Sequence, residues 1–283
     1  MQKPLDQNVG ILHPGQMGIS VAATLQNSGY TVHWASQGRS QQTYRRANQF
    51  SLIDTVTLDD LVKRCTLLVS VCPPDAAETL ADQVISACFR GLYIDANAIS
   101  PKRVLRIGEA MEKAGITFID GGIIGGPAWK PGETWLYLSG VQAEAAAQYF
   151  RAGPLGVRVI STEIGKASAL KMCFAAYTKG TRAMLCAILG AAANLGVLDD
   201  LKDQWGADFY GRAAEGAVNV TAKAWRFIGE MEEIAATFQD AGMPGGFHEA
   251  AADLYRRIGH FKDADPPPDF DVVLQAITQS DRL

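Results

Sequence analysis

The chain has 283 residues, of which 48% are hydrophobic, and a formal net charge of -4. This length supports a substantial core and two domains of ordinary size. Lysine and arginine are spread along the chain, which excludes the clustered positive charge typical of nucleic-acid and anionic-membrane binding. The apolar run at residues 183–198 is too short to span a bilayer comfortably. The first residues lack the apolar core of a signal peptide, so we expect a cytoplasmic protein.

Short apolar runs rich in β-branched or aromatic residues alternate with helical patterns as far as residue 161. The predicted strands are residues 9–12, 30–36, 67–72, 92–95, 116–120, 134–139 and 158–161, with helices between them such as 17–26, 76–86 and 101–113. This alternation is typical of right-handed βαβ crossovers. The sequence therefore predicts an α/β Rossmann domain at residues 1–163, with a doubly wound, mostly parallel sheet.

The pattern changes after residue 161, where no further strand is predicted and alanine-rich helical stretches begin. The first of them is a long helix at about residues 165–195. We therefore expect an all-α C-terminal domain at residues 164–283. The histidines and cysteines of the chain show no metal-ligand spacing, so no metal site is predicted.

The hexapeptide HPGQMG follows the first predicted strand. In the dinucleotide fingerprint Gly-x-Gly-x-x-Gly, the second glycine lets the backbone approach the pyrophosphate and the third lets the helix pack on the strand. Gly15 and Gly18 occupy these two positions, whereas His13 and Pro14 replace the turn glycine. A proline-containing turn also leaves a strand sharply because its φ is fixed. The N–H groups of the helix that follows favour an anion, so we predict a nucleotide site here.

The segment after the second predicted strand indicates which nucleotide is bound. An NAD site places an Asp or Glu about 20 residues after the glycine loop to bind the ribose 2′-hydroxyl, and residues 19–53 contain neither. Ser36, Arg39 and Ser40 instead supply a guanidinium and two hydroxyls, which suit a 2′-phosphate. We therefore predict NADP(H) as the cofactor rather than NAD(H).

Five motifs follow one another along the chain: HPGQMG at 13–18, CPP at 72–74, DANAISP at 95–101, FIDGGIIGG at 118–126 and IGKASALK at 164–171. In this order they resemble the β-hydroxyacid dehydrogenase superfamily, which includes 3-hydroxyisobutyrate and 6-phosphogluconate dehydrogenases and, more distantly, the imine reductases. The segments are most similar to a poorly characterised branch of 6-phosphogluconate dehydrogenase-like oxidoreductases. The resemblance spans nearly the whole chain, and it implies a homodimer formed largely through the helical domain.

The resemblance also implies roles for named residues. The glycine loop and the residues after later strands would bind the cofactor: Gly15, Gln16, Met17, Gly18, Cys72, Pro73, Pro74 and Asn97. Lys171 matches the catalytic lysine of the family. A lysine in a cleft between two domains loses solvation, which lowers its pKa toward neutrality. Lys171 is therefore expected to exchange a proton with a carbonyl or alcohol while nicotinamide carries the hydride.

The residues expected to contact the substrate are Ile124, Gly125, Gly126, Tyr177, Thr178, Arg182 and Glu230. Thr178 and Arg182 follow Lys171 by seven and eleven residues, which places them on the same face of an α-helix. The Ser-Gly-Gly that binds the substrate carboxylate in the family is Ile-Gly-Gly here, and the asparagine four residues after the lysine is Ala175. Glu230 is the acid that aligns with a Lys-Asp pair of the family.

These departures leave three functions open. The lost polar groups disfavour the usual small hydroxy acid or sugar acid, because a buried carboxylate needs paired donors. The pattern favours an NADP-dependent oxidoreductase that transfers hydride between nicotinamide and a small carbonyl or hydroxy compound, with Lys171 as general acid or base. An imine reductase or reductive aminase is the alternative, although these enzymes generally lack the lysine. A non-catalytic NADPH-binding sensor is the third.

Overall fold

The computed structural model describes residues 8–262 and 264–279. Its residues fall into two compact units, Met1–Lys171 and Met172–Leu283, which are described separately below. The division lies within α7 (Lys166–Ala175), so the first turns of this helix belong to the first unit.

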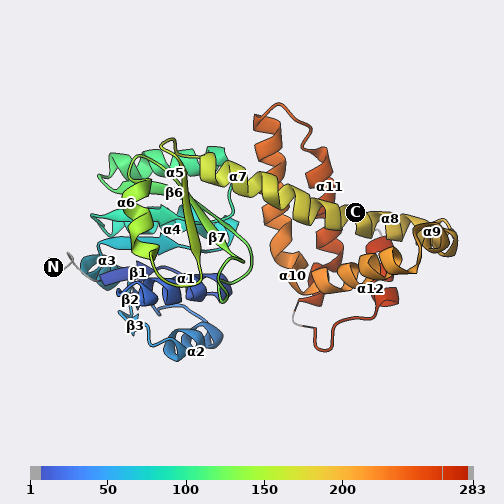
Figure 1. Cartoon of the computed structure of the whole chain (residues 1–283), viewed down its shortest axis with the longest axis horizontal. Coiled ribbons are helices and arrows are strands. Elements are labelled where there is room, and N and C mark those ends of the chain that lie inside the picture. The colour runs from blue at the N-terminus through green and yellow to red at the C-terminus, as the bar shows by residue number, and fades with distance from the viewer. Residues whose placement is uncertain (1–7, 263, 280–283) are drawn as a thin grey trace. The chain divides into compact units, whose positions relative to one another are not determined.

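The first unit contains one eight-stranded sheet with the strand order β3-β2-β1-β4-β5-β6-β7-β8 (Figure 1). Its strands are β1 (Asn8–Ile11), β2 (Thr31–Trp34), β3 (Ile53–Asp54), β4 (Leu67–Ser70), β5 (Leu92–Asp95), β6 (Thr117–Ile124), β7 (Trp135–Ser139) and β8 (Gly156–Ser161). Every neighbouring pair is parallel except β6 and β7, which are antiparallel. The predicted Rossmann architecture with a mostly parallel sheet is confirmed.

Two hydrophobic cores cover the two faces of the sheet, because successive strand residues point to opposite faces. Leu67 and Val69 belong to one core, together with residues of α1 (Gln16–Asn27) and α6 (Ala143–Ala147). Leu68 belongs to the other core, with α3 (Leu58–Arg64), α4 (Ala77–Ser86) and α5 (Pro101–Lys113). All four residues of β4 are buried, as expected for a central parallel strand covered on both faces.

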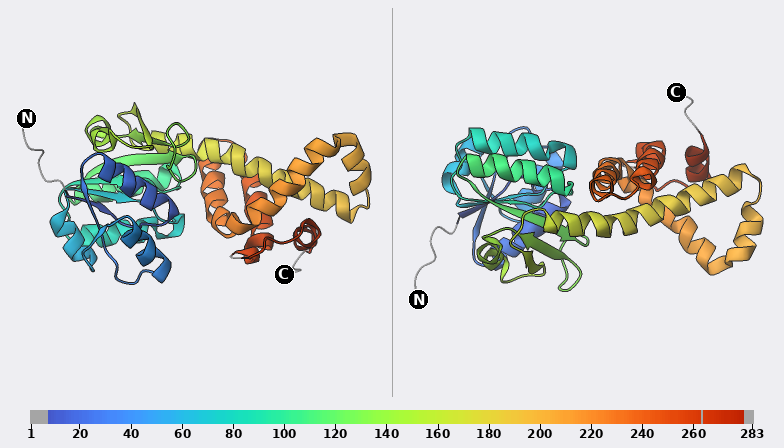
Figure 2. Two further views of the ribbon diagram at one scale, coloured as in Figure 1. Left: turned by 60° about the horizontal axis from the view of Figure 1, so that its bottom comes forward. Right: turned by 90° about the horizontal axis from the view of Figure 1, so that it is seen from above.

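Among the residues described after 171, the second unit contains helices and no strand, as the sequence predicts. Its helices are α8 (Thr181–Asn194), α9 (Leu198–Trp205), α10 (Ala207–Asp240), α11 (Gly246–Ile258) and α12 (Phe270–Thr278), and α10 packs along α11 (Figure 2). The long helix expected at about residues 165–195 is present over residues 166–194, but the π-helical turn η3 (Ala176–Gly180) divides it into α7 and α8. A π-helix closes its hydrogen bonds over five residues, so α-helical spacing does not hold across it.

Candidate functional site

The carboxyl edge of the sheet contains a point at which the strand order reverses. Strand β1 pairs with β2 on one side and with β4 on the other. In open α/β sheets, ligands bind outside the carboxyl ends of the strands at such a point. The glycine loop leaves β1 here, and the predicted residues 72–74 and Asn97 follow β4 and β5 at the same edge.

The glycine loop has the geometry that its spacing predicts. A Cβ on Gly18 would lie 2.1 Å from the His13 carbonyl oxygen, so only glycine fits this position. Gly15 is the N-cap of α1, and Gln16 and Met17 begin the helix. The first turn of α1 has no acidic residue. The N–H groups of this turn can therefore bind an anion without a competing carboxylate.

Two arginines contact this loop from the segment after β2. Arg39 donates to the Leu12 carbonyl oxygen and to Nδ1 of His13, both at 3.0 Å, and Arg46 donates to the Pro14 carbonyl oxygen at 3.4 Å. Burial, and then the charges of Arg39 and Arg46, lower the pKa of His13 to about 4. The sequence did not predict Arg46, because its role depends on how α2 (Gln41–Gln49) packs beside the loop.

A cavity of about 570 Å³ lies beside Arg39. The ends of β1 and β2 contribute Leu12, Ala35 and Gln37, and the helices α3 and α4 supply most of the other walls. The predicted hydroxyls are not among its lining residues: Ser36 is buried, and the Ser40 side chain accepts from the Thr43 N–H at 3.3 Å as the N-cap of α2. Of the three residues predicted to favour NADP, the structure brings only Arg39 to this cavity.

Asn97 joins the ends of β4 and β5. Its Oδ1 accepts from the Cys72 N–H at 2.6 Å, and its Nδ2 donates to Ser70 Oγ at 3.0 Å. Asn97 is 2% exposed, so its side chain is buried. Its hydrogen bond to the Cys72 N–H fixes the start of the segment Cys72, Pro73 and Pro74. Burial raises the pKa of the Cys72 thiol to about 12, which keeps it protonated at neutral pH.

Lys171 lies against the carboxyl end of β6, where its Nζ donates to the Ile123 carbonyl oxygen at 2.5 Å. The backbone around it explains the glycines of FIDGGIIGG. A Cβ on Gly122 would lie 2.6 Å from the Ala167 carbonyl oxygen and 3.1 Å from Lys171 Cβ, so α7 can approach β6 this closely only if residue 122 is glycine.

Asp120 fixes the N-terminus of the same helix. Its carboxylate accepts from the Gly165 N–H at 2.9 Å, the Ser168 N–H at 3.1 Å and the Ser168 hydroxyl at 2.6 Å. Burial raises the pKa of Asp120, and these hydrogen bonds oppose the rise because they stabilise the charged form. The sequence analysis did not single out Asp120. Its position within the motif FIDGGIIGG, two residues before Gly122, could have pointed to it.

The predicted substrate triplet Ile124, Gly125 and Gly126 lies at the end of β6 and the start of the connection to β7. Gly125 has φ +124°, and a Cβ on it would lie 2.5 Å from the Glu133 carbonyl oxygen. The Thr134 hydroxyl donates to the Gly126 carbonyl oxygen at 2.8 Å. Gly125 therefore has a structural reason to be glycine, whereas a Cβ on Gly126 would meet nothing within 4 Å, so nothing in the backbone requires glycine there.

The remaining predicted substrate residues belong to the second unit. Tyr177 and Thr178 lie on the π-helical turn, with Tyr177 72% exposed and the Thr178 hydroxyl donating to the Phe174 carbonyl oxygen. The argument that placed Thr178 and Arg182 on the face of Lys171 used α-helical spacing, which does not hold across this π-helical turn, so their place relative to Lys171 stays a prediction. The buried Glu230 forms an ion pair with Lys179, which the sequence did not single out.

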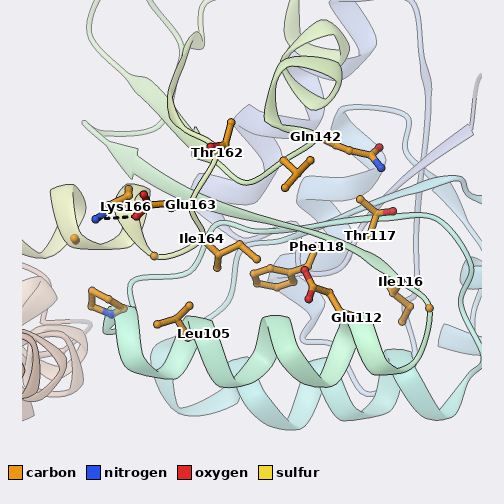
Figure 3. A pocket seen from close by; sticks show the side chains of 15 residues that line it. Leu105, Glu112, Ile116, Thr117, Phe118, Gln142, Thr162, Glu163, Ile164 and Lys166 are labelled. Carbon is orange, nitrogen blue, oxygen red and sulfur yellow. Dashed lines mark ion pairs between the residues drawn. The ribbon is translucent and has the colours of Figure 1, made fainter.

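A larger cavity, of about 840 Å³, lies along α5 (Figure 3). Phe118 and Leu105 line it, and the ion pair between Lys166 and Glu163 lies at its side. The cavity reaches residues 115–118, at the amino end of β6, whereas dinucleotides bind at carboxyl ends. Volume alone therefore does not identify the cofactor site.

Across residues 8–262 and 264–279, no cluster of three or more His, Cys, Asp or Glu side chains is arranged to hold a metal ion. Within the same residues, no helix combines the length and the apolar character needed to cross a bilayer.

Two family models match the chain. The model of the NAD binding domain of 6-phosphogluconate dehydrogenase matches residues 8–150, which is half of the chain and covers the glycine loop, Arg39 and Asn97. A domain of unknown function, DUF1932, matches residues 192–258 in the helical unit.

An uncharacterised 28.5 kDa protein of Methanothermus fervidus, from the 5′ region of 7S RNA, is 29% identical over 170 residues. This match spans 60% of the chain and 65% of the relative, which is slightly less than two thirds of its length. A conserved protein of unknown function, whose structure is similar to 3-hydroxyacid dehydrogenases, is 28% identical with a TM-score of 0.63, over 89% of this chain and 99% of that one.

Two enzymes of known structure share the fold. The 3-hydroxyisobutyrate dehydrogenase of Mycobacterium tuberculosis has a TM-score of 0.68 at 16% identity, over 97% of this chain and all of that one. The imine reductase of Myxococcus stipitatus, in complex with NADP+, has a TM-score of 0.56 at 19% identity, over 95% of this chain and 99% of that one. At such identities these likenesses concern the fold.

Proposed function

Because the chain belongs to the family of the NAD binding domain of 6-phosphogluconate dehydrogenase, we propose that it is an NADP-dependent oxidoreductase. The proposed reaction transfers hydride between nicotinamide and a small carbonyl or hydroxy compound. One observation carries the proposal. The glycine loop after β1 and the Lys171 ammonium at the end of β6 lie at the same carboxyl edge of one sheet.

The residues at this edge fit a phosphorylated dinucleotide. Gly15 leaves the start of α1 without a Cβ, and the first turn has no carboxylate to repel a pyrophosphate. The Nε of Arg39 is buried and, among the described residues, has no hydrogen-bond partner. What supports a role in binding a 2′-phosphate is that Arg39, whose guanidinium suits a phosphate group, lines the cavity. The lack of any acidic residue at 19–53 supports the same choice of NADP over NAD.

Lys171 supplies the proton-transfer group of the proposed reaction. When bound, the nicotinamide supplies or accepts the hydride. In the reducing direction, Nζ of Lys171 donates a proton to the substrate oxygen, and in the oxidising direction it accepts that proton. The bond to the Ile123 carbonyl oxygen holds Nζ at the end of β6 until a substrate oxygen replaces it as the acceptor.

The substrate proposed is a small, neutral or weakly polar carbonyl compound. Ile124 stands where the related dehydrogenases have a serine for the carboxylate, so this edge of the site is apolar. The same observation favours the second candidate, an imine reductase or reductive aminase, whose fold the chain shares. A non-catalytic NADPH sensor is the third candidate and uses the same cofactor residues.

A homodimer is proposed as the working form. Helix α8 is apolar on nearly all sides, and on its outer side Met184 and Ile188 are 53% and 37% exposed. Beyond its end, Leu195 is 75% exposed. A helix without a polar face is typical of an element buried by a further chain. Sedimentation velocity tests this state, and a monomer at working concentrations would contradict it.

The cofactor proposal is tested by fluorescence titration of NADPH and NADH on the wild type and on Arg39→Ala. We expect NADPH to bind at least about tenfold more tightly than NADH, which is about 1.4 kcal/mol, and this preference to be lost in the variant. Arg45→Ala, at an exposed neighbouring position of α2, is the matched control. Equal affinities in the wild type would contradict NADP specificity, and no binding of either nucleotide would contradict the oxidoreductase.

The chemical proposal is tested with Lys171→Met on a panel of hydroxy acids, ketones and a cyclic imine. We expect carbonyl turnover to fall by about a hundredfold or more, as for loss of a general acid, with the NADPH affinity unchanged. Imine reduction that persists in the variant would favour the imine reductase. No turnover by either protein, with normal NADPH binding, would favour the sensor.

A further inference from the structure

His13 occupies the position at which the dinucleotide fingerprint has its first glycine, and its ring lies over the loop. A Cβ built on Gly15 would lie 3.1 Å from Cδ2 and 3.4 Å from Nε2 of His13. The Cδ2–Nε2 edge of the ring therefore packs against Gly15 where a larger residue would have its side chain. Gly15 is the N-cap of α1, where the first backbone N–H groups of the helix are available to an anion.

The contact with Arg39 fixes the tautomer of this ring. A guanidinium has only donors, so Nδ1 of His13 must accept the hydrogen bond from Arg39 Nη1 at 3.0 Å. The proton of the neutral ring then resides on Nε2. Burial and the nearby charges of Arg39 and Arg46 lower the pKa of His13 to about 4, so the ring is neutral at physiological pH.

Within the part of the chain that the structure describes, the Nε2–H of His13 is a donor without an acceptor. Among the described residues, the ring's hydrogen bond is the one from Arg39 to Nδ1, and no acceptor bonds Nε2. The ring is partly exposed, and a donor beside the N-terminus of α1 adds to the N–H groups of that turn. Arg46, bonded to the Pro14 carbonyl oxygen, adds positive charge on the same side of the loop.

We propose that His13 donates a hydrogen bond from Nε2 to the pyrophosphate of the bound dinucleotide, with Arg39 holding the ring in the required tautomer. The inference rests on the proposed function, that the chain binds NADP(H). His13 would thus bind the cofactor through its side chain, which the first glycine of the fingerprint cannot do. Arg39 would have two roles: it would bind the 2′-phosphate directly, and it would orient His13 toward the pyrophosphate.

The test measures dissociation constants for NADPH, NADH and adenosine 2′-monophosphate, which lacks the pyrophosphate, on the wild type, His13→Ala and His13→Gln. We expect His13→Ala to weaken NADPH and NADH equally, by about tenfold or more, and to leave the monophosphate unchanged. His13→Gln should recover most of the loss, since its amide can accept from Arg39 and donate to phosphate. His260→Ala, an exposed histidine of the second unit, is the matched control.

Two results would overturn the inference while leaving the proposed function intact. One is unchanged NADPH binding by His13→Ala, and the other is an equal loss for the monophosphate. No dinucleotide binding by the wild type would overturn both. If His13→Ala does not fold, the ¹⁵N shifts of wild-type His13 give the answer. We expect an Nε2–H tautomer in the free protein and a change at Nε2 on adding NADPH, and an Nδ1–H tautomer or an unmoved Nε2 signal would refute the role.

Discussion

Replacing Asp95 by asparagine should make the protein more stable, and increasingly so as the pH rises. Asp95 is 1% exposed at the end of β5. Its Oδ1 accepts from the Asn97 N–H at 3.0 Å, whereas its Oδ2 is buried and, among the described residues, has no partner. Burial raises its pKa from 3.8 to about 7, with the charge of Asp120 adding to the rise and the hydrogen bonds from Asn97 opposing it.

The sign follows from the two protonation states. Above pH 3.8 the unfolded chain loses the proton of Asp95, while the folded chain keeps it up to about pH 7. The wild type therefore loses stability as the pH rises through this window. The loss is about 1.4 kcal/mol per pH unit where the folded chain is fully protonated at Asp95 and the unfolded chain is fully ionised there. Asparagine is neutral in both states. The stability of Asp95→Asn relative to the wild type should thus increase by about 2 kcal/mol between pH 5 and pH 7.

Urea denaturation of both proteins at pH 5, 6, 7 and 8 measures this difference. Asp82→Asn, at an exposed position of α4, serves as the control and should show no such increase. A free-energy difference between wild type and Asp95→Asn that does not change with pH would refute the reasoning, because it would mean that Asp95 is ionised in the folded protein throughout.

Two further substitutions test the packing of the site. Gly122→Ala would place a Cβ 2.6 Å from the Ala167 carbonyl oxygen. We expect α7 to shift, the free energy of unfolding to fall by about 1–3 kcal/mol and kcat to fall, whereas Gly126→Ala, with nothing within 4 Å of its Cβ, should retain the stability of the wild type. Lys179→Met would leave the carboxylate of Glu230, whose side chain is 7% exposed, without its closest cation. The expected loss in urea denaturation is about 3 kcal/mol, recovered in part by Lys179→Met/Glu230→Leu, and an unrecovered double variant would contradict the explanation.

The sheet could be predicted from sequence where burial leaves a pattern. The strand at 92–95 and the helix at 101–113 occur with the predicted bounds as β5 and α5, because both carry apolar residues at the period of their structure. Strand β3 was missed because its two residues are exposed and carry no such signal. Helix α2 was missed because it buries only Thr43 and Ala47 among polar residues.

The site was predictable where chemistry depends on local spacing and not where it depends on contacts between distant segments. Gly15 and Gly18 follow from a fixed distance along one turn. Asn97 bonds to the Cys72 N–H and to Ser70 Oγ, which lie at and just after the end of β4, and no spacing in its own segment can indicate these partners. The sequence also gave no sign of the π-helical turn, because AYTKG differs little from an ordinary helical sequence, so the α-helical spacing used for Arg182 does not apply across it.

The motif FIDGGIIGG divides along β6 into a part that positions Lys171 and a part that we propose meets the substrate. Asp120 caps α7, Gly122 lets the helix approach, and Ile123 offers the carbonyl oxygen that Lys171 contacts. None of these contacts uses the side chain of Ile124. A change from serine to isoleucine at this position therefore alters the polarity offered to a substrate while leaving the support of Lys171 intact. The catalytic role proposed for Lys171 is therefore compatible with an apolar triplet beside it, and the class of substrate does not follow from the lysine.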